Sequence, residues 1–423
     1  MYKKTEFKNG LRLISIPVEN ANSVTVLILV GTGSKYETKD ISGISHFLEH
    51  MFFKGTEKRS DTLNISETLD KIGGEYNAFT SKEVTGFWAK VDKKHIDIAI
   101  DWISDIFLNS KFEEEELNRE KGVIIEELNM YLDTPTAYVS EIFEDLLYGD
   151  QPAGWRIIGE KETILATDRK KMMDYFKAHY SSKNTVVCVS GDIKPKEVEE
   201  KINKYFDKIE ESEAPKKLAV KEEQTEPEIL VHYKKTDQTH FCLGVRAFDM
   251  FDKRKYALNL MGIILGGNMS SRLFISVRER NGLAYYVHTS LDTTSDTGCL
   301  VTQAGVKNEG LEKSIELILK EYKDLKDKKI TSEELQKAKD YLRGKMALSL
   351  DATDSKATFF AMQEVMNQKV LTPEEKLEMI DKVTINDINN IAKEIFVPEK
   401  LNLAVIGPIQ ENKKQELKKL LKI

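Results

Sequence analysis

Residues 42–55 read Ser-Gly-Ile-Ser-His-Phe-Leu-Glu-His-Met-Phe-Phe-Lys-Gly, and this stretch carries the most informative pattern in the chain. It predicts a short helix that opens after a polar residue and closes at a glycine. At 3.6 residues per turn, His46, Glu49 and His50 share one face, while apolar neighbours cover the packing side. The pattern therefore places two imidazoles and a carboxylate on one stripe of a helix.

Two imidazoles one helical turn apart can hold one metal ion. Histidines at positions i and i+4 suit Zn²⁺, and a carboxylate beside them is placed to take a proton from metal-bound water. The sequence thus predicts His46 and His50 as ligands and Glu49 as the base, in an order that inverts the commoner zinc-protease motif. The alternative interpretation is a solvated polar helix face that bears two unrelated histidines.

A tetrahedral catalytic zinc site needs a third protein ligand. The best candidates lie in a predicted helix over residues 112–132, whose first turn is acidic. There Glu120 and Glu127 fall two turns apart on the stripe of apolar residues. Buried carboxylates are costly unless they are paired or bind a metal, so we expect one to be a ligand and the other to support a ligand histidine. For a lone glutamate, a charged helix surface would be the better interpretation.

This spacing resembles that of the pitrilysin-like zinc metallopeptidases, and within them the mitochondrial-processing-peptidase type and its bacterial relatives. In that family a glutamate follows His-x-x-Glu-His at a set distance, and the interval from His50 to Glu127 matches it. The resemblance implies that His46, His50 and Glu127 bind one Zn²⁺ per chain. It also implies that Glu49 is the general base and Glu120 the supporting carboxylate.

Residues 73–80, Gly-Gly-Glu-Tyr-Asn-Ala-Phe-Thr, carry a second part of the resemblance. They are similar to the family's strand that pairs with an extended substrate beside the metal. The resemblance implies that Gly74, Asn77 and Ala78 contact the peptide substrate.

The third part of the resemblance lies in the other half of the chain. A glycine-rich run over residues 265–274 leads into residues 278–285, and together they are similar to a family loop followed by an arginine and a tyrosine at this spacing. The resemblance implies that Arg278 and Tyr285 reach across the cleft and stabilise the developing oxyanion, for which a guanidinium and a phenol are suitable donors. Without the family, Arg278 would be taken as a surface ion-pair residue and Tyr285 as a core aromatic. The run lacks the Gly-Lys-Ser/Thr ending of a phosphate loop and does not predict a nucleotide site.

Length and composition agree with a globular protein of two domains. A chain of 423 residues is too long for one ordinary core. With 63 basic and 70 acidic residues the net charge is -7, which argues against nucleic-acid binding as the main role. Cys188, Cys242 and Cys299 are far apart and are expected to be reduced core residues. The chain has neither a signal peptide pattern nor an apolar run of membrane-spanning length, so we expect a cytoplasmic protein that does not bind membranes.

The two halves of the chain repeat one pattern of elements. Residues 12–28 align with residues 229–245 at a constant offset, and residues 180–193 align almost equally well with residues 396–409. Each half opens with a pair of predicted strands and closes with a strand that runs into a glycine turn, with helical segments between. The pattern indicates an internal duplication.

The charged stretch 210–228 is the predicted linker between the halves. It defines a metal-binding catalytic domain over residues 1–215 and a homologous domain over residues 225–423 that completes the substrate cavity. Only the first copy carries the His-x-x-Glu-His pattern, so the second is expected to bind no metal.

The resemblance covers essentially the whole chain and implies an α+β fold in each half, with an antiparallel sheet of about six strands packed against helices. The family builds a closed peptide chamber from four such domains, so we expect this chain to pair, most simply as a homodimer and otherwise as a heterodimer with a paralogue. The predicted function is that of a zinc endopeptidase that cleaves unfolded peptides or presequence-like segments. The alternative is a non-catalytic peptide-binding or structural subunit of a heteromeric peptidase complex, against which the intact ligand set argues. A small-molecule zinc hydrolase is disfavoured by the duplicated architecture.

Overall fold

The computed structural model describes residues 2–367 and 369–423 and separates into two compact units, each assembled from three stretches of chain. Unit 1 comprises Met1–Leu128, Arg156–Leu218 and Met346–Pro373, and unit 2 comprises Asn129–Trp155, Ala219–Lys345 and Glu374–Ile423. The units differ from the sequence-based domains 1–215 and 225–423 by an exchange of two segments. A stretch of the first half belongs to unit 2, and a stretch of the second half belongs to unit 1.

Unit 1 is built on a six-stranded sheet with the order β1-β2-β6-β3-β5-β4. Its strands are β1 Lys3–Glu6, β2 Arg12–Pro17, β3 Ser23–Val30, β4 Glu75–Thr80, β5 Thr85–Asp92 and β6 Thr185–Gly191. The central strand β3 reads SVTVLILV and is buried from its second residue onward, as a strand with both faces covered must be. β2 and β6 are parallel and the other neighbours are antiparallel, because β6 returns after a long helical connection to lie between β2 and β3.

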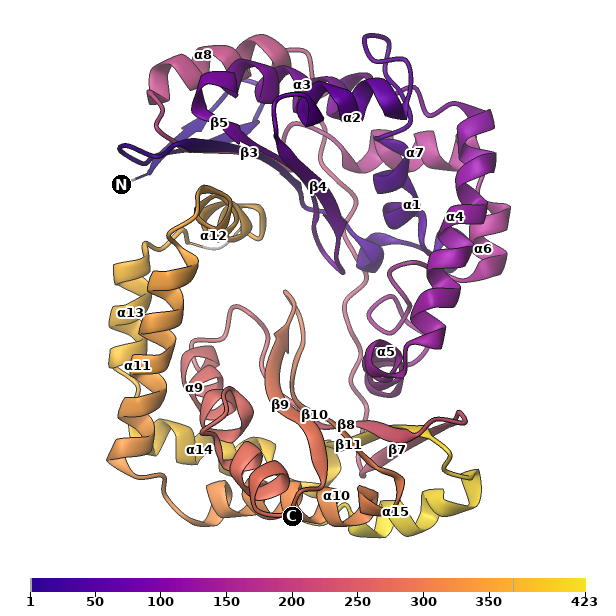
Figure 1. Cartoon of the computed structure of the whole chain (residues 1–423), viewed down its shortest axis with the longest axis vertical. Coiled ribbons are helices and arrows are strands. Elements are labelled where there is room, and N and C mark those ends of the chain that lie inside the picture. The colour runs from indigo at the N-terminus through magenta and orange to yellow at the C-terminus, as the bar shows by residue number, and fades with distance from the viewer. Residues whose placement is uncertain (1, 368) are drawn as a thin grey trace. The chain divides into compact units, whose positions relative to one another are not determined.

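Helices cover both faces of this sheet, with α3 and α8 on one side and α12 on the other (Figure 1). The helices of unit 1 are α1 Ile44–Met51, α2 Thr62–Asp70, α3 Ile96–Asn109, α6 Lys161–Ala166, α7 Arg169–His179, α8 Pro195–Phe206 and α12 Thr353–Val365. Helix α4, Glu114–Asp133, begins in unit 1 and contributes its residues up to Leu128.

Unit 2 repeats the arrangement with a five-stranded sheet in the order β7-β11-β8-β10-β9. Its strands are β7 Glu228–Tyr233, β8 Gln238–Arg246, β9 Ala284–Thr293, β10 Gly298–Lys307 and β11 Leu401–Gly407. β7 and β11 are parallel and the other pairs are antiparallel, which is the pairing of β2, β6, β3, β5 and β4 in unit 1. The predicted α+β fold with a duplicated sheet is therefore confirmed, with the correction that both sheets are mixed.

The helices of unit 2 are α5 Pro135–Tyr148, α9 Lys255–Gly266, α10 Leu311–Asp327, α11 Ser332–Ser349, α13 Pro373–Asp381, α14 Ile385–Ile395 and α15 Lys414–Leu420. Helix α11 contributes its residues up to Lys345. None of the helices in the described part of the chain combines the length and the apolar content that crossing a bilayer requires.

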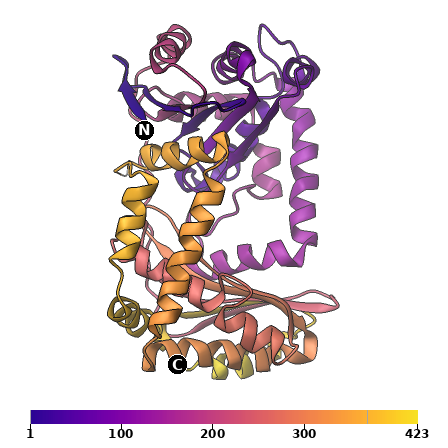
Figure 2. The ribbon, with the colours of Figure 1, turned by 60° about the vertical axis from the view of Figure 1, so that its left-hand side comes forward.

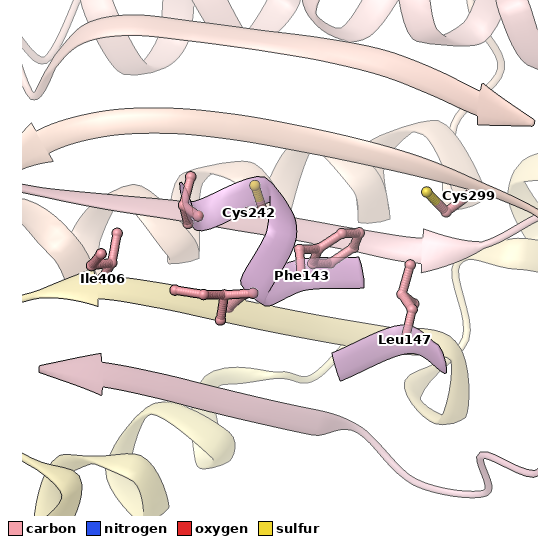
Figure 3. Packing of buried hydrophobic residues seen from close by; sticks show 8 residues of the cluster. Phe143, Leu147, Cys242, Cys299 and Ile406 are labelled. Atoms are coloured by element: carbon pink, nitrogen blue, oxygen red, sulfur yellow. The ribbon is translucent and has the colours of Figure 1, made fainter. Parts of the chain in front are cut away.

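Helices α5 and α12 are the exchanged elements. Helix α5 belongs to the first half of the sequence but packs on strands β8 and β11 of unit 2, where Phe143 and Leu147 belong to one buried cluster with Cys242, Cys299 and Ile406 (Figure 3). Helix α12 belongs to the second half but packs on β3 and β6 of unit 1, and it lies beside these strands in both views (Figure 2). Both helices follow the strand hairpin and two long helices of their own half, so they are equivalent members of the repeat.

The three cysteines are free and buried, in β6, β8 and β10, which confirms them as reduced core residues. The predicted linker has no helix or strand before β7, but it is fastened to each unit in turn. In unit 1 the Glu210 carbonyl accepts from the Ser182 amide at 2.9 Å, and in unit 2 the Gln224 side chain donates to the Leu401 carbonyl at 3.0 Å. A segment held by such hydrogen bonds is not a freely flexible tether.

Candidate metal centre

The helix predicted around the histidine pair is α1, Ile44–Met51. Its apolar side chains Ile44, Phe47, Leu48 and Met51 are fully buried, whereas His46, Glu49 and His50 are only partly covered. The helix is short because it starts after Gly43, whose φ of 93° lies in the left-handed region, and ends where Phe52 turns the chain into the next loop. The amphipathic pattern thus fixes the apolar face in the core and leaves the polar stripe accessible.

Helix α4 brings Glu127 to the two histidines. One ligand atom from each of His46, His50 and Glu127 lies within 4.8 Å of the others, and among the described residues this is the one such cluster of three histidine, cysteine or acidic side chains. The distances to the carboxylate are 3.7 Å from His46 Nε2 and 3.4 Å from His50 Nε2. The side chains keep between 13% and 24% of their surface exposed, so a small molecule can reach the cluster.

The second glutamate of α4 supports one of the histidines. Glu120 is buried and its Oε1 lies 2.9 Å from His50 Nδ1, which leaves Nε2 directed to Glu127. Its other oxygen, Oε2, pairs with Lys54 Nζ at 2.5 Å. A carboxylate behind a ligand imidazole is the usual means of fixing the ring and its tautomer. His46 differs, because its buried Nδ1 has no hydrogen-bond partner among the described residues.

These donors fit a catalytic zinc ion. Two imidazole nitrogens and one carboxylate converge from two helices, and their side chains stay partly exposed. This is the ligand set of hydrolytic zinc sites that keep a position for water or substrate. Alkaline-earth ions prefer sites made mainly of oxygen ligands, which two imidazoles do not provide.

The neighbouring charges set the protonation state of the metal-free cluster. Burial and the neighbouring charge of His50 lower the pKa of His46 to about 4. Burial also acts to lower the pKa of His50, but hydrogen bonds with Glu120 and Glu127 outweigh it and raise that pKa to about 9. The hydrogen bond from His50 helps to hold the pKa of Glu127 below its usual value. The metal-free cluster therefore holds a proton on His50 at neutral pH, and a metal ion that binds Nε2 must displace it.

Glu49, the predicted proton acceptor, is held by a hydrogen bond from strand β4. Its Oε2 accepts a hydrogen bond of 2.5 Å from the Thr80 hydroxyl at the end of β4. Burial raises the pKa of Glu49 above its ordinary value, and the Thr80 hydrogen bond opposes that rise. A carboxylate whose pKa is shifted toward neutrality exchanges protons effectively near pH 7.

The predicted substrate strand is β4, the outermost strand of its sheet, which pairs with β5 alone. Its second edge can therefore accept an extended chain, and β4 packs beside α1. Asn77 is exposed and Ala78 half-buried on this strand. Gly74 directly precedes β4, and a Cβ there would lie 3.2 Å from Leu69 Cβ, so close packing alone accounts for this glycine.

Arg278 and Tyr285 lie in unit 2. Arg278 is in a π-helical turn, Phe274–Glu279, and its guanidinium carbon lies 4.7 Å from the centre of the Phe274 ring and 5.7 Å from that of Tyr285. Tyr285 is 75% exposed at the start of the edge strand β9, so the interpretation as a core aromatic is wrong. The cross-cleft role of the two side chains stays a prediction.

Sequence reasoning missed two side chains of the site, Lys54 and Thr80. Lys54 stands within the opening stretch, and the charge of Glu120 on the predicted inner face of α4 was the signal that a cation should lie opposite. Thr80 closes the predicted substrate strand, but nothing in its sequence context pointed to Glu49.

Two family models match the chain, "Insulinase (Peptidase family M16)" over residues 12–161 and "Peptidase M16 inactive domain" over residues 167–342. The chain is 36% identical over 408 residues to the uncharacterized zinc protease YmxG of Bacillus subtilis, covering 96% of this chain and 98% of that protein. The chain belongs to the M16 peptidase family. An uncharacterized zinc protease of Rickettsia felis is 33% identical over 96% of this M16 chain and 97% of its own.

Solved structures agree on the fold of this M16 protein. A protease from Helicobacter pylori superposes with a TM-score of 0.90 at 24% identity, covering 96% of this chain and 99% of that one. A Pseudomonas fluorescens structure described as a peptidase M16 inactive domain gives a TM-score of 0.88 at 17% identity, with 97% and 98% covered. The resemblance to the pitrilysin-like peptidases is thus confirmed, and the names of the relatives support a zinc-dependent peptidase.

Proposed function

We propose that this M16 protein is a zinc endopeptidase that hydrolyses unfolded peptides or presequence-like segments, with one Zn²⁺ per chain bound by His46, His50 and Glu127. The observation that carries the proposal is the convergence of these three side chains within 4.8 Å. The hydrogen bond from His50 Nδ1 to Glu120 adds to it, because it directs Nε2 toward the same point.

A bound Zn²⁺ would supply Lewis acidity, which polarises a peptide carbonyl and makes water a better nucleophile at neutral pH. Glu49 then takes the proton of the attacking water on a carboxylate oxygen and delivers it to the leaving amine nitrogen as the C–N bond breaks. The Thr80 hydroxyl keeps the carboxylate oriented during both transfers. The raised pKa of Glu49 suits a group that must first accept and then release a proton.

The edge strand β4 supports the choice of unfolded substrates. A peptide that adds to a sheet edge must offer a free run of backbone N–H and C=O groups, which a folded protein does not expose. In this proposal Asn77 and Ala78 contact the side chains and backbone of the extended peptide, and Gly74 marks the entry to the strand. Sequence specificity would then come from side-chain pockets and not from the backbone pairing.

Arg278 and Tyr285 are proposed to stabilise the oxyanion of the tetrahedral intermediate, as fixed cationic and phenolic donors do. We further propose that two copies of the chain assemble as a homodimer, because the family encloses peptides with four domains and this chain supplies two units. A heterodimer with a paralogue is the other form this assembly can take. The intact ligand set disfavours a non-catalytic subunit.

The decisive experiment is metal analysis of the purified protein together with a chelator-reversible assay on a panel of short peptides. We expect one zinc atom per chain and cleavage that a chelator abolishes. His50→Ala should lose both zinc and activity, whereas Glu126→Gln, an exposed carboxylate next to Glu127 on the same helix, should keep both. A wild-type protein that cleaves the peptides equally well after complete metal removal would refute the proposal.

A further inference from the structure

The helix that carries the histidines has no capping side chain at its own N-terminus. The N-cap residue is Gly43, and a Cβ at this position would lie 2.5 Å from the Ile158 carbonyl oxygen. The left-handed φ and this contact both require glycine. The serine, threonine, aspartate or asparagine that most often caps a helix therefore cannot stand here.

The missing acceptor comes from Glu37, six residues earlier in the chain. Its Oε2 accepts a hydrogen bond from the Gly43 amide at 2.7 Å, and its Oε1 accepts one from the Ser45 amide at 2.8 Å. Only 2% of Glu37 is exposed. A carboxylate at this end of a helix satisfies free N–H groups and complements the positive end of the helix dipole. Burial raises the pKa of Glu37 to about 7, while the hydrogen bonds from Ser45 and Gly43 act to lower it.

The same turn is tied to helix α7 by a chain of buried hydroxyls. The Tyr175 hydroxyl lies 2.8 Å from Ser45 Oγ and 2.8 Å from Thr32 Oγ1, and Thr32 Oγ1 lies 3.1 Å from His179 Nδ1. All four side chains are buried, and the Tyr175 and His179 rings stack with centroids 4.2 Å apart. Buried polar groups with all partners in place hold one geometry, because any rearrangement leaves a group unsatisfied.

The two histidines depend on this anchorage to different degrees. The ring of His50 is oriented directly by Glu120, but the Nδ1 of His46 has no partner among the described residues. His46 therefore lacks a support of this kind and depends more on where the backbone of α1 places it, and Ser45, which Glu37 holds, is its immediate neighbour. An eight-residue helix is marginal on its own, so its position depends on its ends and its packing.

We propose that Glu37 is a positioning residue of the metal centre, which holds the first turn of α1 so that His46 converges with His50 and Glu127. This inference rests on the proposed function, in which those three residues bind zinc. Glu37 does not touch the metal or the substrate. It acts through the amides of Gly43 and Ser45, with Tyr175 as the second anchor of the same turn.

The test is Glu37→Gln, which keeps the size of the side chain but turns an NH₂ group toward one of the two amide donors. We expect zinc affinity in a chelator competition to fall by roughly 10- to 100-fold, the range for lost support behind a metal ligand. At saturating zinc, kcat should fall while KM stays unchanged. Hydrogen exchange of the amides over residues 43–47 should become faster, a readout that does not depend on activity.

Asp61→Ala is the control, since Asp61 caps helix α2 by accepting from the Asn64 amide, alanine removes that cap, and α2 carries no residue of the site. It should speed exchange at the start of α2 and leave zinc affinity and kcat unchanged. Tyr175→Phe removes only the hydroxyl between Ser45 and Thr32 and should shift zinc affinity in the same direction by a smaller factor. If Glu37→Gln does not fold, Tyr175→Phe decides the question.

A folded Glu37→Gln protein with wild-type zinc affinity and kcat would overturn the inference, as would Tyr175→Phe with wild-type affinity where it has to decide. An equal loss of zinc affinity in Asp61→Ala would also overturn it, because the effect would then follow any weakened helix cap. A wild-type protein that binds no zinc overturns the proposed function and this inference with it, whereas wild-type binding with unchanged variants overturns this inference alone.

Discussion

Replacing Phe143 of helix α5 by alanine should destabilise unit 2, although α5 belongs to the first half of the sequence. Phe143 is 3% exposed in a cluster with Cys242 and Cys299, and its ring lies against Gly244, where a Cβ would come within 2.8 Å of Phe143 Cζ. Replacing a buried phenylalanine by alanine typically costs about 3–5 kcal/mol, because apolar surface is lost and a cavity remains. The backbone of β8 lies against this ring and is fixed by its strand pairing, so it cannot move to fill the cavity that the ring would leave. We therefore expect Phe143→Ala to fall in the upper part of that range.

The assay is hydrogen exchange under native conditions, which reports the stability of each unit separately where a single unfolding curve would mix them. Phe143→Ala should speed exchange in β8 and β11 and leave β3 and β6 unchanged. The mirror variant is Phe360→Ala in α12, which should do the reverse. Faster hydrogen exchange of the β3 and β6 amides in Phe143→Ala would refute the placement of α5 on the sheet of unit 2.

The placement of α5 on the sheet of the other half also predicts what happens when the two halves are expressed separately. A cut between residues 215 and 225 leaves α5 on the fragment that lacks its sheet, with Val139, Ile142, Phe143 and Leu147 uncovered. Burying each such side chain contributes about 1.5–3 kcal/mol, so the four together match the whole stability of an ordinary domain. We expect residues 1–215 alone to be unstable by circular dichroism and to recover on mixing with residues 225–423. A stable, zinc-binding 1–215 fragment would contradict this.

Four further predictions concern the metal centre. Glu49→Gln should retain zinc and lose turnover, because an amide keeps the shape but cannot accept the proton; near wild-type cleavage would reassign the base. Glu120→Gln should weaken zinc binding by roughly 10- to 100-fold in a chelator titration, and unchanged affinity would remove it from the site. Zinc must displace the proton that His50 holds up to a pKa of about 9, so apparent zinc affinity should rise as pH increases through neutrality, with about one proton released per zinc ion. Calorimetry in buffers of different ionisation enthalpy measures that proton release, and a zinc affinity that does not change with pH would contradict the prediction. Tyr285→Phe should lower kcat by roughly 10²- to 10³-fold at unchanged zinc content, and a normal kcat would exclude it as an oxyanion donor.

The parts of the site set by local periodicity were predictable from the sequence. The spacing of His46, Glu49 and His50 places them on one helical face whatever the rest of the chain does, and the stripe with Glu120 and Glu127 is of the same kind. That the two helices would meet came from the resemblance, since no local signal joins residues so distant in sequence. Thr80 and Glu37 could not be found in this way. Each acts through one side-chain group that reaches across a loop, and neither belongs to a periodic pattern in the sequence.

The duplication was also predictable, but its three-dimensional consequence was not. The apolar face of α5, with Val139 and Phe143, indicates that the helix is buried against something. It does not indicate which of two homologous sheets receives it, because both offer similar apolar strands. The parallel pairing of β2 with β6 was missed for a related reason. Strand alternation predicts which face is buried and leaves the order of strands in the sheet open.

The reciprocal placement of α5 and α12 bears on how this chain arose and on why its second copy persists. The arrangement is that of a domain-swapped dimer of single-unit molecules, which exchange equivalent helices, after fusion into one chain. Each half then contributes one helix to the sheet of the other. In such a lineage the carboxy-terminal copy can lose its metal ligands without becoming dispensable. A gene that discarded it would also discard the helix that covers β3 and β6, the strands at the heart of the copy that kept its histidines. Selection on the active half would therefore preserve the inactive one as part of its own core.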